Sequence, residues 1–211
     1  MKWAGITLVN IMKYFVCTIL VLLFNANLAN AEEGDAIAGK SKSKFCQGCH
    51  GEDGNSINPL CPNLSGQNQN YLEKQILDFQ AGRRVDSIMT GISQGLISDQ
   101  DAKDIAAYFS SRKPMVGFSG NKLGQNIFRE GKLGIKLPSC ASCHGENGKG
   151  RSDENTTFPI IGGQTRDYIA KQLRDLRSGD RHNDPESIMG NVARKLSDAE
   201  IEALADYVSG L

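Results

Sequence analysis

The apolar residues of the first half of the chain follow a helical repeat in three segments. Residues 34–45, 71–82 and 98–109 place apolar side chains three or four positions apart, which is the spacing that lines one face of an α-helix. Ser98 is suited to cap the third of these helices, and Gly82 is suited to end the second. The pattern therefore predicts an all-α first half.

The second half repeats the same order of segments. Its predicted helices cover residues 123–128, 168–179 and 197–207. Pro114 and Gly117 break the helical pattern between the two halves. A chain of 211 residues has room for two small domains. We predict an N-terminal domain at 32–113, a linker at 114–119 and a C-terminal domain at 120–211.

The N-terminal residues 1–31 have the pattern of an export signal. Lys2 and Lys13 precede an apolar run at residues 14–24, and Ala29-Asn30-Ala31 forms a small-residue cleavage site. The run is short for a membrane span, and an anchor retained in the mature protein is the alternative. The chain balances 24 basic against 24 acidic side chains, so it has no basic surface for nucleic acid. We therefore expect an exported protein whose signal is cleaved.

The pattern C-x-x-C-H occurs once in each half. It consists of Cys46, Cys49 and His50 in the first half, and of Cys140, Cys143 and His144 in the second. On a short helix, these three side chains project from neighbouring positions on one side. Two thiols so placed can bond the vinyl carbons of a haem while the imidazole reaches its iron. Two copies in matching surroundings predict two covalently attached haem c groups.

A zinc site and a thioredoxin-like redox motif are the alternatives for this pattern. A structural zinc ion needs four ligands, which Cys46, Cys49, His50 and Cys61 would supply in the first half. The second half has no cysteine in the place of Cys61, so a repeated site would lack a repeated fourth ligand. A thioredoxin-like motif requires a βαβ setting, whereas helical patterns surround both copies. Covalent haem attachment is the better interpretation.

Two methionines, Met89 and Met189, occupy the same place in the two halves, each directly after Ser-Ile. The chain has only three histidines, so two bis-histidine haems are impossible. We predict that both methionines lie on loops and bind iron through their thioether sulfur, opposite His50 and His144. The alternative is that they fill the core, while Met115 has no counterpart and no predicted role. An iron closed on both sides by protein ligands transfers electrons and leaves no place for a substrate, so we expect an electron carrier.

Two further pairs of residues match between the halves, namely Pro62 with Pro159 and Arg84 with Arg181. Each proline carbonyl either accepts the N–H of the proximal imidazole or simply belongs to a turn, and spacing alone does not decide between these. Each arginine ends a predicted helix and either holds haem propionates or is solvated. Both questions stay open at the level of the sequence.

Two residues with suitable chemistry have no counterpart, Cys61 and His182. We predict that Cys61 is a small buried residue, with pairing between chains or chemical reactivity as the alternatives. We predict that His182 lies on the surface, with a pH-linked role as the alternative.

These features together resemble the dihaem cytochrome c4 family over the whole mature chain. The resemblance is carried by the two haem motifs, residues 62–67, the segments 71–84 and 168–181, and both Ser-Ile-Met stretches. It implies two tandem class I cytochrome c domains related by approximate twofold symmetry, each wrapped around one c-type haem. It also implies His/Met ligation and haems that face each other and exchange electrons.

The resemblance extends to individual positions of this chain. It supports Pro62 and Pro159 as partners of the haem-binding imidazoles. It also implies that two glycines pack closely against the final helix of their half, Gly39 near Tyr108 and Gly124 near Tyr207. These contacts are expectations that a structure can test.

The same resemblance implies a periplasmic location, often at the membrane, and electron donation to a terminal oxidase. We predict a respiratory-chain carrier that takes single electrons from a quinol-oxidising complex and associates at most peripherally with the inner membrane. The alternative is a dihaem electron-transfer subunit of a sulfide- or thiosulfate-oxidising enzyme. A dihaem enzyme with one open iron is a third class.

Overall fold

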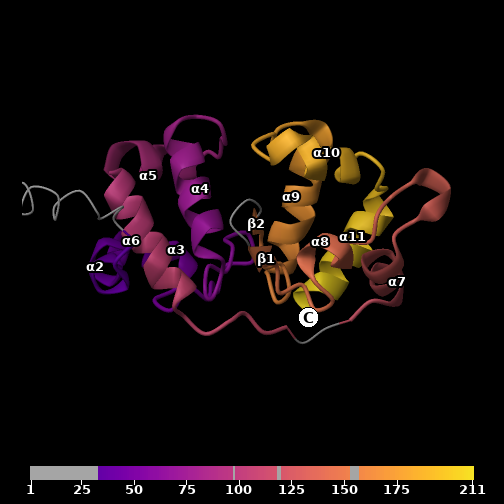
Figure 1. The fold of residues 1–211 in the computed structure, drawn as a ribbon, viewed down its shortest axis with the longest axis horizontal. Helices are drawn as coiled ribbons and strands as arrows, with labels where there is room; N and C mark the ends of the chain where they lie inside the picture. The colour runs from indigo at the N-terminus through magenta and orange to yellow at the C-terminus, as the bar shows by residue number, and fades with distance from the viewer. Residues whose placement is uncertain (1–32, 97, 118–119, 153–156) are drawn as a thin grey trace, which may run out of the picture. The chain divides into compact units, whose positions relative to one another are not determined.

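The two halves of the chain form two successive groups of helices (Figure 1). The computed structural model describes residues 33–96, 98–117, 120–152 and 157–211. The first half contains α2 (Ala36–Lys42), α3 (Lys44–His50), α4 (Gln69–Gln80), α5 (Met89–Leu96) and α6 (Asp99–Ser110). The second half contains α7 (Lys122–Glu130), the 3₁₀ helix η1 (Leu133–Ile135), α8 (Ala141–His144), α9 (Arg166–Ser178), the 3₁₀ helix η2 (Pro185–Ser187), α10 (Ile188–Ala193) and α11 (Asp198–Ser209). The short strands β1 (Arg151–Ser152) and β2 (Thr157–Phe158) pair antiparallel. The prediction of a helical fold is confirmed.

Helix α6 is the centre of the first half, because α2 and α4 both pack against it. Its N-terminus carries a reciprocal capping box, in which the Ser98 hydroxyl accepts from the Asp101 N–H and the Asp101 carboxylate accepts from the Ser98 N–H. The buried cluster of this half comes from α4 and α6 and consists of Leu72, Ile105, Ala106, Tyr108 and Phe109. The helix predicted at 98–109 is thereby confirmed to within one residue at each end.

Helix α11 has the same role in the second half, where α7 and α9 pack against it. Ser197 and Glu200 repeat the capping box at its N-terminus. The buried cluster is larger than in the first half, with Ile127, Phe128, Leu137, Ala170, Leu196, Ile201, Leu204, Ala205, Tyr207 and Val208. The repeat seen in the sequence is therefore also a structural repeat, in which the final helix of each half has the same N-terminal capping box and packs against the two corresponding helices.

Two glycines allow the entry helices to lie directly against the final helices. A Cβ added at Gly39 of α2 would lie 2.9 Å from the Tyr108 Cβ and closer still to the carbonyl oxygen of Asp104. A Cβ added at Gly124 of α7 would lie 2.8 Å from the Tyr207 Cβ. These distances are too short for real carbon atoms, so only glycine permits this approach. The expected packing of both glycines is confirmed.

The prediction of one continuous helix at 34–45 is wrong at its C-terminal end. Helix α2 ends at Lys42, and α3 begins at Lys44. Ser43 between them is completely buried, and its hydroxyl accepts a hydrogen bond of 3.0 Å from the Gln47 Nε2. A buried serine that bonds to the backbone and to a neighbouring side chain marks a break that apolar spacing does not reveal.

The prediction of loops at Met89 and Met189 is also wrong. Met89 is the first residue of α5, and Met189 lies in α10. The carboxylate of Asp86 accepts from the N–H groups of Ile88 and Met89, at 3.0 and 3.1 Å, directly before α5. An aspartate in this place satisfies backbone donors that the first helical turn leaves unpaired. Helices this short show no clear apolar repeat, so the sequence pattern missed them.

The chain following α6 is mostly exposed along its described part, but two of its residues anchor it. Met115 is buried with 1% of its surface exposed, and its sulfur lies 3.6 Å from the Gln164 Nε2. The Gly117 N–H donates to the Leu211 carbonyl at 3.1 Å. The segment that joins the halves is thus held on the second half.

The contacts divide the chain into Met1–Glu33 and Gly34–Leu211, so both groups of helices belong to one unit. The predicted export signal at 1–31 lies outside the described residues and stays a prediction. Within the described ranges, no helix is long and apolar enough to cross a membrane.

Candidate haem-binding sites

Each C-x-x-C-H motif ends a short helix. In the first half, α3 carries Cys46, Cys49 and His50 on consecutive turns, and Gly51 ends the helix with a positive φ of 82°. His50 is buried, Cys46 is half-buried and Cys49 is exposed. Both thiols therefore lie beside the buried imidazole at the edge of the helix, as covalent attachment of a porphyrin requires.

The second motif repeats this arrangement on a shorter helix. Cys140 caps α8, and Cys143 and His144 lie on its only full turn. Gly145 ends the helix with a φ of 79°, which matches the turn after His50. His144 is buried to the same degree as its counterpart, with 6% against 5% of the surface exposed. The structure thus brings together the predicted cysteine and histidine residues of each half.

A proline carbonyl fixes each imidazole. The distance from the His50 Nδ1 to the Pro62 oxygen is 2.9 Å, and that from the His144 Nδ1 to the Pro159 oxygen is also 2.9 Å. A carbonyl can only accept, so each Nδ1 carries the proton and donates. The remaining ring nitrogen, Nε2, is then unprotonated and available as a metal ligand. The role of both prolines as imidazole partners, which the sequence left open, is confirmed.

Burial also favours the neutral imidazole that a metal needs. Burial lowers the pKa of both His50 and His144 below the usual range, although the hydrogen bond with the proline carbonyl opposes this shift. A protonated ring would lose its lone pair at Nε2 and could not bind iron. The environment of both residues therefore fits the axial ligand of a haem.

The thiols of the motifs differ in their surroundings. Burial raises the pKa of the Cys46 thiol, and it raises that of Cys140 to about 11. Burial likewise raises the pKa of Cys61, and the neighbouring Cys49 thiol, which shares a hydrogen bond with it, adds to the shift. The prediction of a small buried residue is thus right only in part, because Cys61 is half-buried and lies beside Cys49.

The zinc interpretation gains no support from this proximity. Within the described ranges, no group of three or more His, Cys, Asp and Glu side chains is arranged to hold a metal ion. Cys61 approaches Cys49, but these two thiols and His50 do not form such a group. The geometry favours the haem interpretation of the motif.

The two methionines take equivalent places in the structure. Met89 begins α5, which packs against α4, and Met189 lies in α10, which packs against α9. Both are half-buried. The Asp86 carboxylate that holds the Met89 N–H has a lowered pKa, because hydrogen bonds from Ile88 and Met89 outweigh the effect of burial. In the second half, the Asp184 carboxylate accepts from the Gly190 N–H of α10 instead, so an aspartate anchors each of the two helices at a different backbone position.

Arg84 and Arg181 lie just beyond the ends of α4 and α9, and each bonds to residues of the other half. Arg84 donates to Gln75 in its own half and to Tyr168 and Gln172 in the other, at distances of 2.7 to 2.9 Å. Its side chain is 8% exposed, so the solvated alternative is wrong for this residue. Arg181 donates in mirror fashion to Gln172, Tyr71 and Gln75. Binding of propionates by these arginines stays a prediction.

Sequence reasoning missed the residues that join the halves. They include the tyrosines and glutamines of α4 and α9, namely Tyr71, Gln75, Tyr168 and Gln172, and two glutamines in the preceding loops, Gln67 and Gln164. Each occupies the same place in its repeat. A buried polar residue that is duplicated with the fold is the signal that would have found them. His182, by contrast, lies on the surface as predicted.

Comparison with known proteins agrees with this geometry. The sequence model of the cytochrome c family matches residues 31–113 and 122–211. Cytochrome c4 of Pseudomonas aeruginosa is 44% identical over 204 residues, which cover 95% of this chain and all of that protein. The crystal structure of reduced recombinant cytochrome c4 from Pseudomonas stutzeri superimposes with a TM-score of 0.79 at 46% identity, and the match covers 84% of this chain and 99% of that one.

A more distant relative has a different name. The thiosulfate dehydrogenase electron acceptor of Stutzerimonas stutzeri is 31% identical over 201 residues, which cover 91% of each protein. Cytochrome c4 of Pseudomonas aeruginosa has the higher sequence identity of the two proteins, and it is matched over its full length. With two cytochrome c domains and two C-x-x-C-H motifs, the chain belongs to the cytochrome c4 family and is a dihaem electron-transfer cytochrome with two covalently attached haem c groups.

Proposed function

We propose that this cytochrome carries single electrons in the periplasm from a quinol-oxidising complex to a terminal oxidase. The observation that carries the proposal is the pair of buried imidazoles, each held by a proline carbonyl 2.9 Å from its Nδ1. Ligands held this firmly keep their place when the charge of the iron changes, which keeps the rearrangement on electron transfer small.

The proposal assigns the axial ligands as His50 with Met89 and His144 with Met189. Haem c supplies a one-electron iron couple, and a thioether ligand raises its potential. Cys46, Cys49, Cys140 and Cys143 would hold the two porphyrins through thioether bonds. The equivalent placement of both methionines on helices that pack against α4 and α9 supports this assignment.

Export and membrane association are parts of the same proposal. A cleaved signal at 1–31 would deliver the chain to the periplasm, where the mature protein starts near Glu32. Sequencing the N-terminus of the protein purified from its natural host tests the cleavage. Washing membranes with high salt distinguishes peripheral association, which is released, from a retained anchor, which is not.

The function is tested by electron transfer to and from defined partners. The purified dihaem protein is mixed with a quinol-oxidising complex and quinol, and then with membranes that contain a terminal oxidase. We expect rapid reduction in the first step and rapid reoxidation under oxygen in the second. Reduction that requires a thiosulfate- or sulfide-oxidising enzyme instead would contradict the proposal.

The second candidate is an electron acceptor for a thiosulfate- or sulfide-oxidising enzyme. The relative named thiosulfate dehydrogenase electron acceptor favours it, since the similarity extends over nine-tenths of both chains. A stable one-to-one complex with a flavoprotein or with a thiosulfate-oxidising enzyme on purification would support this candidate. The lower identity of 31% makes it the weaker of the two.

A further inference from the structure

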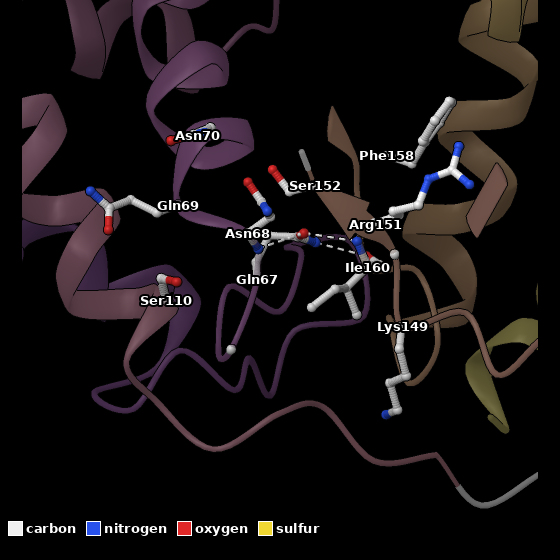
Figure 2. Close-up of a pocket in the computed structure, with 12 residues that line it drawn as sticks. Gln67, Asn68, Gln69, Asn70, Ser110, Lys149, Arg151, Ser152, Phe158 and Ile160 are labelled. Atoms are coloured by element: carbon white, nitrogen blue, oxygen red, sulfur yellow. Dashed lines mark hydrogen bonds between the residues drawn. The ribbon is translucent and has the colours of Figure 1, made fainter. Parts of the chain in front are cut away.

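Two buried glutamines clamp the backbone of the opposite half. The side chain of Gln164, in the second half, accepts from the Asn63 N–H at 2.7 Å and donates to the Asn63 carbonyl at 2.9 Å. The side chain of Gln67, in the first half, accepts from the Ile160 N–H at 2.9 Å and donates to the Ile160 carbonyl at 2.7 Å. Figure 2 shows the bonds between Gln67 and Ile160. The two clamps are reciprocal.

The orientation of both amides is fixed by their partners. The Gln164 Oε1 also accepts from the Thr165 N–H at 2.8 Å, and the Gln67 Oε1 accepts from the Asn68 N–H at 2.9 Å. Each oxygen thus faces two N–H donors, and each Nε2 faces a carbonyl. If the amide were flipped by 180°, its NH2 group would face the two backbone N–H groups and its oxygen would face the carbonyl. Only one orientation therefore forms all of these hydrogen bonds. Both side chains are at least 94% buried.

The clamped residues directly follow the prolines that hold the imidazoles. The carbonyl of Pro62 and the N–H of Asn63 belong to one peptide group. This group accepts from the His50 Nδ1 at its oxygen and donates to the Gln164 Oε1 at its nitrogen. The peptide group between Pro159 and Ile160 does the same between His144 and Gln67. Each imidazole is therefore linked through a single peptide plane to a glutamine of the other half.

A peptide group bonded at both ends is polarised. An acceptor at its N–H moves electron density toward its carbonyl oxygen, and the oxygen then accepts more strongly. A stronger acceptor at Nδ1–H makes the imidazole a better donor to a metal, as partners of metal-bound histidines do in general. A better donor stabilises ferric over ferrous iron and lowers the reduction potential of the haem.

We propose that each half of the protein tunes the haem of the other: Gln164 lowers the potential of the haem bound by His50, and Gln67 lowers that of the haem bound by His144. Both glutamines are positioning residues that act through the Pro62–Asn63 and Pro159–Ile160 peptide groups. The inference rests on the proposed assignment of His50 and His144 as axial ligands. One consequence is that separation of the halves, which breaks both clamps at once, alters both potentials.

Gln164→Met and Gln67→Met test the inference in the full-length dihaem protein. Methionine keeps the length of the side chain and removes all three backbone hydrogen bonds of the amide. We expect Gln164→Met to raise the potential of the first haem, with up to about a tenfold change in its ferric-to-ferrous ratio, or 59 mV for one electron. The second haem should keep its potential. Gln67→Met should give the reverse, so the affected haem always lies in the half without the mutation.

Two further variants separate tuning from loss of structure. Asn63→Ala keeps the peptide clamp but removes two other hydrogen bonds. These are the bond of 3.1 Å from the Asn63 Nδ2 to the Gly163 carbonyl, across the same junction, and the bond of 2.9 Å from the Ser56 N–H to the Asn63 Oδ1. We expect no change in the first potential from this control. Gln164→Glu keeps an oxygen opposite the Asn63 N–H, so the first potential should stay or fall. The change in potential expected for Gln164→Glu is thus not the rise expected for Gln164→Met, and it can still be measured if the methionine variant does not fold.

The potentials are measured by voltammetry. The two haems are distinguished with Met89→His, which replaces the thioether ligand by a nitrogen ligand and lowers only the potential of the first haem. A rise in the haem of the mutated half, equal rises in both haems, or a rise of the same size in Asn63→Ala would overturn the inference. A rise in Gln164→Glu would overturn it as well. If Met89→His leaves both haem spectra unchanged, the ligand assignment fails, and that failure is visible independently of the glutamine variants.

Discussion

Replacing Gly39 with alanine tests whether the approach of α2 to α6 holds the first half together. The added Cβ would lie 2.5 Å from the carbonyl carbon of Asp104 and 2.9 Å from the Tyr108 Cβ, whereas carbon atoms in contact are about 3.5 to 4.0 Å apart. Helix α2 therefore has to move by about 1 Å. The movement weakens the hydrogen bond of 2.8 Å from the Asp35 N–H to the Asp104 carboxylate.

The magnitude follows from opposing effects. Alanine favours a helix over glycine by about 1 kcal/mol. Overpacking costs about 1 to 3 kcal/mol or more, and a lost hydrogen bond costs about 1 kcal/mol. Because the contact here is with backbone atoms that cannot rotate away, we expect Gly39→Ala to lower the free energy of unfolding by about 2 kcal/mol. For a domain of this size, that is a fall of roughly 10 °C in the melting temperature.

Thermal unfolding of the purified dihaem protein, followed by circular dichroism and by haem absorbance, measures this fall. The matched control is Lys40→Ala, the next position of α2, whose side chain is exposed. It should change the melting temperature by little. An unchanged or higher melting temperature for Gly39→Ala would show that α2 does not need glycine, and the packing argument would be wrong.

Further predictions concern the haems and the response to acid. Met89→Ala and Met189→Ala should each open one iron, so that carbon monoxide binds to about half of the reduced haem and that haem has a lower potential; an unchanged spectrum would refute the ligand assignment. Cys46→Ala should leave about one covalent haem per chain by pyridine haemochrome assay, and two haems would argue against thioether attachment at this position. Hydrogen bonds from Lys42 and the Asp35 N–H outweigh the effect of burial and lower the pKa of Asp104. The contribution of this carboxylate to stability is therefore present above the unfolded pKa of about 3.9, and it is lost as the pH falls through the pKa of the folded protein. Urea midpoints should therefore fall less between pH 5 and pH 3 in Asp104→Asn than in the parent, and equal falls would contradict this.

The haem motifs were predictable because their chemistry lies in consecutive residues. Cys46, Cys49 and His50 need only one short helix to come together, and the second copy removes the doubt that a single copy leaves. The final helices were equally predictable, because Ser98 and Ser197 begin them with capping boxes. Local signals of this kind do not depend on the rest of the fold.

The residues that depend on contacts between distant segments could not be predicted in the same way. Arg84 follows the end of α4 and looks like a surface residue in the sequence, yet its partners Tyr168 and Gln172 come from the other half. The loops assigned to Met89 and Met189 failed for a different reason. Their helices begin after an aspartate and a serine and are too short for periodicity to show.

Duplication explains how one set of residues comes to serve both halves. In a symmetric pair of identical copies, a glutamine that binds the backbone of the other copy is matched by the same glutamine of that copy, which binds in return. The two clamps at Gln67 and Gln164 therefore arise together. Once the copies are fused into one chain, the two halves can differ in sequence, as they do at Asn63 and Ile160. The hydrogen bonds of the clamps are kept, because they are made to the backbone of these residues and not to their side chains. Because the clamp uses only N–H and carbonyl groups, substitution of the clamped residue leaves it intact, whereas substitution of either glutamine breaks it. Substitutions around either haem can therefore change the two potentials independently, while the proposed link from each imidazole to the other half depends on Gln67 and Gln164 alone.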